Sequence, residues 1–133
     1  MKRTRLISAA FGTALLAGAM SQVSGSVTEA DFHLKSTEDL YQVCSVAADA
    51  TDFVPATYEC RGFIKGAVGY HDAVTAKEHL SRLICYTETA TVEEGRQAFV
   101  DWARANAGNK ELMQEQPVVG LVRALKAKYP CSK

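Results

Sequence analysis

The stretch Cys60-Arg61-Gly62-Phe63-Ile64-Lys65-Gly66-Ala67-Val68-Gly69 lies at the centre of the segment that decides the fold. Around it, the residues of one apolar stripe recur at steps of three and four, at Cys60, Phe63, Ile64, Ala67, Val68, His71 and Val74. This spacing is that of the buried face of an α-helix, so we predict a helix from Ala56 to Lys77. No segment shows the alternation of apolar and polar residues that is typical of a strand.

The same segment carries a second face of small residues at Gly62, Gly66 and Gly69. Glycine inside a helix costs up to about 1 kcal/mol relative to alanine, so a row of them indicates that another backbone packs closely there. We expect this neighbour to be another helix of the same chain. The alternative is a second subunit, in which case the face is a dimer interface.

Helix boundaries on either side are marked by capping residues. Ser36 and Thr37 are good N-cap types and precede two acidic residues, which predicts a helix that begins there and ends near Asp49. Thr91 and Glu94 have the spacing of a capping box and begin a third helix, which ends near Gly108-Asn109.

A fourth helix contains an apolar series and ends at Pro130, with Val118, Leu121, Val122, Leu125 and Tyr129 on its buried side. Pro55 fits the first turn of the second helix, where a missing N–H costs nothing. The sequence therefore predicts an all-α fold over residues 36–133, a small four-helix bundle-like domain.

Four cysteines, Cys44, Cys60, Cys85 and Cys131, lie within this domain. An even number of cysteines in a chain that is exported, as the N-terminal pattern described below indicates, predicts two disulfides. A zinc site is disfavoured, because zinc ligands usually come in pairs roughly two to four residues apart, and these cysteines are 16, 25 and 46 residues apart. If consecutive helices run up and down, Cys44 and Cys60 share one end of the bundle and Cys85 and Cys131 the other. We therefore predict the pairs Cys44–Cys60 and Cys85–Cys131.

The N-terminus has the pattern of a secretory signal peptide. Lys2, Arg3 and Arg5 precede an apolar run from Leu6 to Met20, followed by small and polar residues up to about residue 25. A membrane anchor is disfavoured, because a spanning helix needs about 20 apolar residues and this run is shorter. We predict that residues 1–25 are removed, that residues 26–35 form a flexible start, and that the mature protein is periplasmic with no further membrane contact.

The charge of the mature chain excludes some partners. Removal of the first 25 residues leaves 12 basic and 15 acidic side chains, distributed without a basic patch. Nucleic acid is therefore not expected as a partner. About 108 residues remain, which is enough for one domain.

The sequence contains no recognisable catalytic motif. His71 lies on the apolar stripe, where a hydrogen-bonded core histidine is expected more than a catalyst. Asp72 beside it is the nearest approach to a dyad, but neighbouring residues on a helix point in different directions. We predict a binding protein and no enzyme, with no catalytic residues, no metal site and no cofactor. Two connections are the candidate contact surfaces, through Tyr86, Thr87 and Glu88 and through Glu111 and Glu115.

The four cysteines and their neighbours resemble the Rap/Tai family of immunity proteins. The similarity lies in the stretch from Cys60 to Gly66, the earlier Cys44, Cys85 followed by Thr91, and the ending Ala124-Leu125 with Tyr129-Pro130-Cys131. The resemblance implies an exported helical protein of the periplasm, often a homodimer. It also implies that the protein binds a peptidoglycan amidase toxin delivered by type VI secretion and blocks its catalytic cleft, in a toxin–antitoxin-like inhibition.

A second hypothesis is a periplasmic chaperone of the acid-stress type, which binds unfolded clients. The two disulfides and an ordinary content of charged residues, 23%, favour the immunity protein. An enzyme with an unrecognised site is the last of the three.

Overall fold

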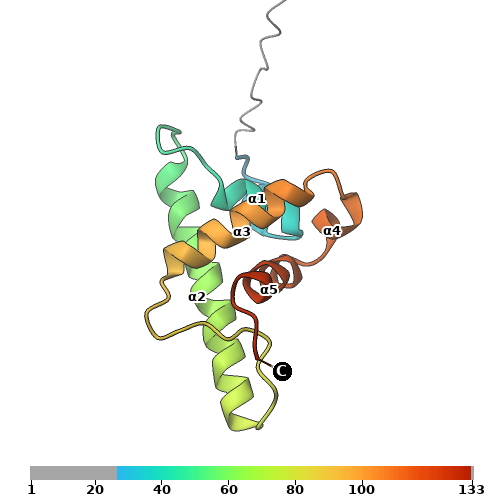
Figure 1. The fold of residues 1–133 in the computed structure, drawn as a ribbon. Helices are drawn as coiled ribbons and strands as arrows, with labels where there is room; N and C mark the ends of the chain where they lie inside the picture. The colour runs from blue at the N-terminus through green and yellow to red at the C-terminus, as the bar shows by residue number, and fades with distance from the viewer. Residues whose placement is uncertain (1–26, 133) are drawn as a thin grey trace, which may run out of the picture.

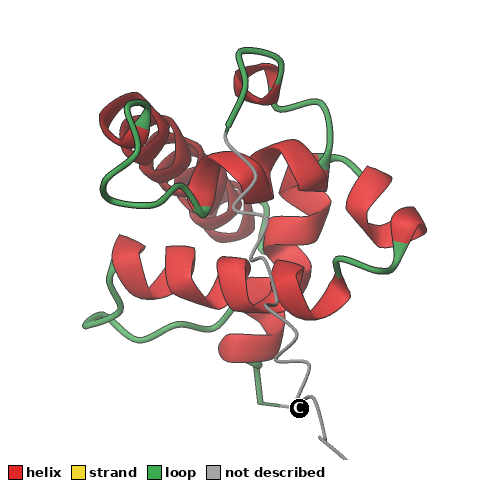
Figure 2. Cartoon of the chain, turned by 90° about the horizontal axis from the view of Figure 1, so that it is seen from above, coloured by secondary structure: helices red, strands yellow, loops and turns green. Residues whose placement is uncertain are grey.

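The computed structural model describes residues 27–132. Its elements, in chain order, are a short 3-10 helix η1 (Asp31–His33) and the α-helices α1 (Thr37–Cys44), α2 (Phe53–Lys77), α3 (Val92–Asn106), α4 (Lys110–Gln114) and α5 (Pro117–Lys128). No strand occurs between residues 27 and 132, so the predicted all-α class is confirmed (Figure 2). The predicted signal peptide lies outside the described residues.

Both capping boxes form as the sequence predicts. The Ser36 hydroxyl accepts the Asp39 N–H at 3.2 Å, and the Asp39 carboxylate accepts the Ser36 N–H at 3.0 Å. At α3, the Thr91 hydroxyl accepts the Glu94 N–H at 3.1 Å and the Glu94 carboxylate accepts the Thr91 N–H at 2.7 Å. These contacts satisfy N–H groups that the first turn of a helix leaves unpaired.

Three features differ from the prediction. Helix α2 begins at Phe53 and not at Ala56, and Pro55 still lies in its first turn. Helix α1 ends at Cys44 and not near Asp49, because the Cys44 carbonyl accepts a hydrogen bond from the Arg96 guanidinium at 2.7 Å and needs no further helical turn. The connection predicted between the last two helices contains α4, a single turn in which the Asn109 side chain accepts the Leu112 N–H at 3.2 Å. These changes add one short helix and leave the predicted order intact.

Helix α1 lies at the centre of the fold. It contacts η1 and each of the other four α-helices. The core around it is formed by side chains with almost no exposed surface, the largest of which are Phe99, Leu40, Ile84, Leu121 and Val43. The long helix α2 lies against α1 and α3, while α5 packs beneath α3 (Figure 1).

Helix α5 approaches the start of α1 closely at Gly120. Thr37 is fully buried, and its hydroxyl lies 3.1 Å and 3.2 Å from the carbonyls of Glu115 and Gln116, to which it donates. A Cβ at Gly120 would lie only 2.3 Å from the Thr37 methyl carbon. Only glycine therefore fits at position 120 without moving one helix.

The stretch ahead of α1, for which the sequence predicts flexibility, contains ordered contacts from Val27 onward. Val27 is 8% exposed and belongs to the core. The Thr28 N–H and hydroxyl donate to the Asp31 carboxylate, at 2.6 Å and 2.8 Å, at the start of η1. The packed domain in the described chain thus includes residues 27–35.

The disulfides join Cys44 to Cys60 and Cys85 to Cys131, the pairs expected from the helix order. The first is buried in the core between α1 and α2. The second joins the connection after α2 to the C-terminal end, with Cys85 exposed and Cys131 half-buried.

This difference in exposure leads to a prediction about reduction. A dithiol reductant under native conditions should open Cys85–Cys131 first, because thiol–disulfide exchange requires access to a sulfur. Alkylation followed by peptide mass spectrometry should label Cys85 and Cys131 well before Cys44 and Cys60. In denaturant all four should react together. Early labelling of the core pair under native conditions would contradict the burial seen here.

Helix α2 extends beyond the body of the domain. Its C-terminal third extends past α3 and α5, and the connection that follows returns beside it (Figure 1). Among the described residues, no helix is long and apolar enough to cross a membrane.

Candidate functional site

The connection of residues 78–91 is held against α2 and the C-terminus along its length. It turns at His79, which has a positive φ of 51°. The Leu80 N–H then donates to the Thr75 carbonyl at 3.1 Å, and the Cys85 N–H donates to the Tyr129 carbonyl at 3.0 Å. With the disulfide at Cys85, these bonds give a segment without regular structure a defined path.

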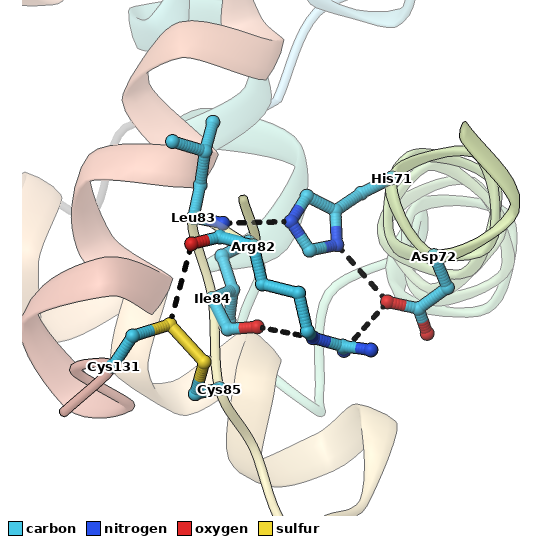
Figure 3. The surroundings of a disulfide bond; sticks show 7 residues. All are labelled: His71, Asp72, Arg82, Leu83, Ile84, Cys85 and Cys131. Carbon is cyan, nitrogen blue, oxygen red and sulfur yellow. Dashed lines mark hydrogen bonds and ion pairs between the residues drawn. A yellow bond between two sulfur atoms is a disulfide. The ribbon is translucent and has the colours of Figure 1, made fainter. Parts of the chain in front are cut away.

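His71 attaches the middle of this connection to α2 (Figure 3). Its Nε2 accepts the Leu83 N–H at 3.1 Å, so Nε2 carries no proton and Nδ1 donates to the Asp72 carboxylate at 3.0 Å. The two side chains therefore meet, and the expectation that neighbouring helical residues would point apart is wrong here. Both are occupied by structural bonds, so the pair positions the connection.

Asp72 is the centre of a small polar cluster. It accepts hydrogen bonds from the Arg82 guanidinium at 2.7 Å and from the Tyr86 hydroxyl, in addition to His71. Burial alone would raise the pKa of Asp72, but the bonds from Tyr86 and His71 and the charge of Arg82 outweigh it and hold the pKa below its usual value. The bond to Asp72 in turn raises the pKa of the Tyr86 hydroxyl. Arg82 also donates to the Ile84 carbonyl at 3.2 Å.

The lowered pKa of Asp72 predicts a pH-dependent contribution to stability. A carboxylate whose pKa is lower in the folded chain stabilises it above the unfolded pKa, and this stabilisation is lost as the pH falls through the folded pKa. Asp72→Asn should therefore lower the free energy of unfolding by about 1 kcal/mol at pH 7, after allowance for partial exposure. The difference from the unaltered protein should shrink as the pH falls below the ordinary aspartate pKa of about 4, and it should vanish once the pH is below the lowered pKa of Asp72.

Urea unfolding at a series of pH values measures this effect. Asp101→Asn is the matched control, because the Asp101–Arg104 ion pair is exposed on the surface of α3. It should change stability little at any pH. A loss for Asp72→Asn that persists undiminished at low pH would show that the carboxylate charge is not what stabilises the cluster.

A pocket of about 290 Å³ lies next to this cluster, between α2, the connection, the start of α3 and the end of α5. Its lining is mainly apolar, with Ile64, Val68, Ile84 and Leu125 among the residues that contribute. Polar residues also line it, namely Lys65, Asp72, Tyr86, Thr91 and Tyr129. The rings of Tyr86 and Tyr129 meet edge to face, with centroids 6.3 Å apart. Burial, with a smaller effect of Glu94, raises the pKa of Tyr129.

The predicted contact residues fall on two separate parts of the surface. Tyr86 is half-buried in the pocket wall, while Thr87 and Glu88 beside it are exposed. Glu111 is exposed on α4, on another side of the molecule (Figure 1). Glu115 forms an ion pair with Arg123 at 2.6 Å. The structure does not bring the two groups together.

The small-residue face of α2 has no neighbour among the residues that the structure describes. A Cβ at Gly62, Gly66 or Gly69 would meet no atom of the described residues within 4 Å. The expectation that another helix of the chain packs there is therefore wrong, because α1 and α3 pack against the opposite, apolar stripe. The second-subunit alternative stays a prediction. Tyr58 and Tyr70, which lie on the same helix, are exposed.

Sequence reasoning missed Arg82, the pocket and two exposed apolar side chains, Leu80 and Leu83. Leu80 and Leu83 are 55% and 49% exposed near the protruding end of α2. The signal that could have found them is two leucines outside any helical stripe. The described residues contain no group of three or more potential ligands arranged to hold a metal ion.

Comparison with protein families decides the identity. The family model of the Rap1a immunity proteins matches residues 36–131. The chain belongs to the Rap1a immunity protein family. In this Rap1a-family protein the match runs from the N-cap of α1 to the last cysteine, so it includes both disulfides and the pocket. No curated protein and no solved structure matches the chain. As an immunity protein, it has an effector protein as its partner.

Proposed function

We propose that this protein is a periplasmic immunity protein that binds a peptidoglycan amidase delivered by type VI secretion and blocks its active site. The observation that carries the proposal is the family match over residues 36–131. Export is supported by the charged and apolar pattern at the N-terminus. Two disulfides in a chain of this size are typical of an oxidising compartment, which fits the periplasm.

The protruding end of α2 is suited to occlude a cleft. The connection that follows it presents Leu80 and Leu83 to solvent, on a segment fixed by His71, Arg82 and the disulfide at Cys85. A segment whose backbone is held in place before binding loses less conformational entropy when a partner covers it. Inhibition by this surface needs only shape and apolar contact, and no reactive group.

The test begins with the mature, oxidised protein as bait for secreted and periplasmic fractions of its own and neighbouring strains. We expect one stoichiometric partner that cleaves peptide bonds in purified peptidoglycan and loses this activity when the immunity protein is added. Capture of many unrelated unfolded proteins, mainly at low pH, would favour the chaperone hypothesis. A single partner without amidase activity would overturn the proposed target.

Variants separate the occluding surface from the rest of the molecule. Leu80→Glu with Leu83→Glu should abolish inhibition, because two charges would replace the apolar contact. Val118→Glu with Val119→Glu is the control, since these α5 residues are also partly exposed. Equal inhibition by both double variants would place the contact elsewhere, with the connections at Tyr86–Glu88 and Glu111–Glu115 as the next candidates.

The open glycine face of α2 is the proposed homodimer contact. A row of small residues lets two helix backbones approach closely, and exposed Tyr58 and Tyr70 would extend the contact. Gly66→Trp should convert a dimer to a monomer in light scattering without loss of helix content, since the position has open space around it. A monomeric unaltered protein at high concentration would contradict the prediction.

A further inference from the structure

We propose that the pocket between α2, the connection, α3 and α5 binds one aromatic side chain of the effector that lies next to an acidic residue. This inference rests on the proposed function, because it takes the occupant to be part of the bound effector. It adds a second contact, one in which the immunity protein receives a side chain of its partner.

The size and lining of the pocket select a single side chain. Pockets for cofactors and free ligands occupy roughly 300–1,000 Å³, and this one, at about 290 Å³, is at or below the lower limit. Its apolar lining comes from Ile64, Val68, Ile84 and Leu125, and the rings of Tyr86 and Tyr129 contribute to the same wall. An incoming ring can pack against both the aliphatic groups and the edges of these two rings.

The pocket is formed before any partner arrives. The disulfide from Cys85 fixes one wall, and the capping box of Thr91 with Glu94 fixes the turn into α3. The bond from the Leu83 N–H to His71 holds the connection against α2. A pre-formed recess of this kind is where interfaces concentrate their binding energy, because little order has to be created on binding.

The charges at the pocket favour an acidic residue next to the bound aromatic residue in the sequence of the effector. Lys65 and Asp72 are the charged residues among those that line it. The charge of Asp72 is already compensated by Arg82 and by hydrogen bonds from Tyr86 and His71. Lys65 is exposed and forms no ion pair with any described residue. Among the residues that line the pocket, Lys65 is therefore the one charged side chain without an ion-pair partner in the described chain, and it complements an acidic side chain on the partner.

Short peptides test this recognition without knowledge of the effector. The probe is an acetylated and amidated tripeptide with tryptophan between two aspartates, titrated into the isotope-labelled mature protein and followed by two-dimensional NMR. We expect saturable shifts of the Gly69, Ile84 and Gly95 amides with a Kd on the order of 1 mM, as one buried side chain supports. The same tripeptide with alanine in place of tryptophan should cause no shift at these amides.

Charge reversal supplies the matched control. Lys65→Glu should reverse the preference, so that a tripeptide with lysines around the tryptophan binds roughly fivefold more tightly than the one with aspartates. Lys77→Glu, on the same helix but away from the pocket, should keep the preference of the unaltered protein. Ala90→Trp, which fills the pocket from its own wall, should remove the shifts altogether.

Absence of shifts at the pocket amides at saturating peptide, or shifts that are the same in Ala90→Trp, would overturn the inference. So would a preference for flanking charge that Lys65→Glu leaves unaltered. These results are independent of the capture of an effector, so the pocket can fail while the immunity function stands. In the reverse case, a pocket that binds the peptide in a protein that inhibits no amidase would overturn only the proposed function.

Discussion

Replacement of Gly120 by alanine should lower the free energy of unfolding by about 2 kcal/mol, the result of two opposed effects. The new Cβ would lie 2.3 Å from the methyl carbon, 2.4 Å from the hydroxyl oxygen and 2.9 Å from the Cβ of Thr37. Thr37 cannot rotate away without losing its bonds to the Glu115 and Gln116 carbonyls. Forced overpacking lowers the free energy of unfolding by up to about 3 kcal/mol, and the better helix propensity of alanine raises it by about 1 kcal/mol.

The open glycines of α2 provide the control for this variant. Gly66→Ala meets no described atom within 4 Å, so at protein concentrations too low for the proposed dimer only the propensity gain remains, and stability should rise by about 0.5–1 kcal/mol. Urea unfolding of the two variants beside the unaltered protein measures both signs. A Gly120→Ala variant as stable as Gly66→Ala would show that α5 can move away from α1 at little cost, contrary to the packing seen here.

This pair of variants also shows what the sequence could predict. Helix positions followed from apolar spacing and from the capping residues at Ser36 and Thr91, because these signals act over three or four residues. The reason for each glycine did not follow. From the row of glycines at Gly62, Gly66 and Gly69 we predicted a close helix contact on that face. The close contact lies instead at Gly120, whose neighbour Thr37 is far away in the sequence.

The candidate site was less predictable for the same physical reason. The pocket collects residues from α2, the connection, α3 and α5, and no short pattern spans these segments. Asp72 and Arg82 meet only because the connection reverses direction after α2. The predicted loop at Tyr86 was correctly placed beside the disulfide. However, the Tyr86 hydroxyl is bonded to Asp72, and the exposed apolar side chains of the connection lie earlier, at Leu80 and Leu83.

Removal of the buried disulfide, by Cys44→Ala with Cys60→Ala, should be the most damaging of the changes considered, with a loss of about 5 kcal/mol. The entropy of loop closure alone predicts the opposite order, in which loss of Cys85–Cys131 costs more than loss of Cys44–Cys60. The 16-residue separation of Cys44–Cys60 corresponds to about 3 kcal/mol, and the 46-residue separation of Cys85–Cys131 to about 4 kcal/mol. Burial reverses this order, because loss of each buried sulfur leaves a space in the core, at about 1 kcal/mol each.

The comparison with Cys85→Ala and Cys131→Ala decides between loop length and burial. That double variant should lose about 4 kcal/mol, since its sulfurs are largely at the surface and leave no cavity. Unfolding in urea gives both values, and hydrogen exchange locates the damage. The core variant should exchange faster throughout α1 and α2, whereas the surface variant should exchange faster mainly in residues 78–91. If the surface pair proves more costly, chain entropy dominates, and the packing of Cys44 and Cys60 between α1 and α2 contributes little.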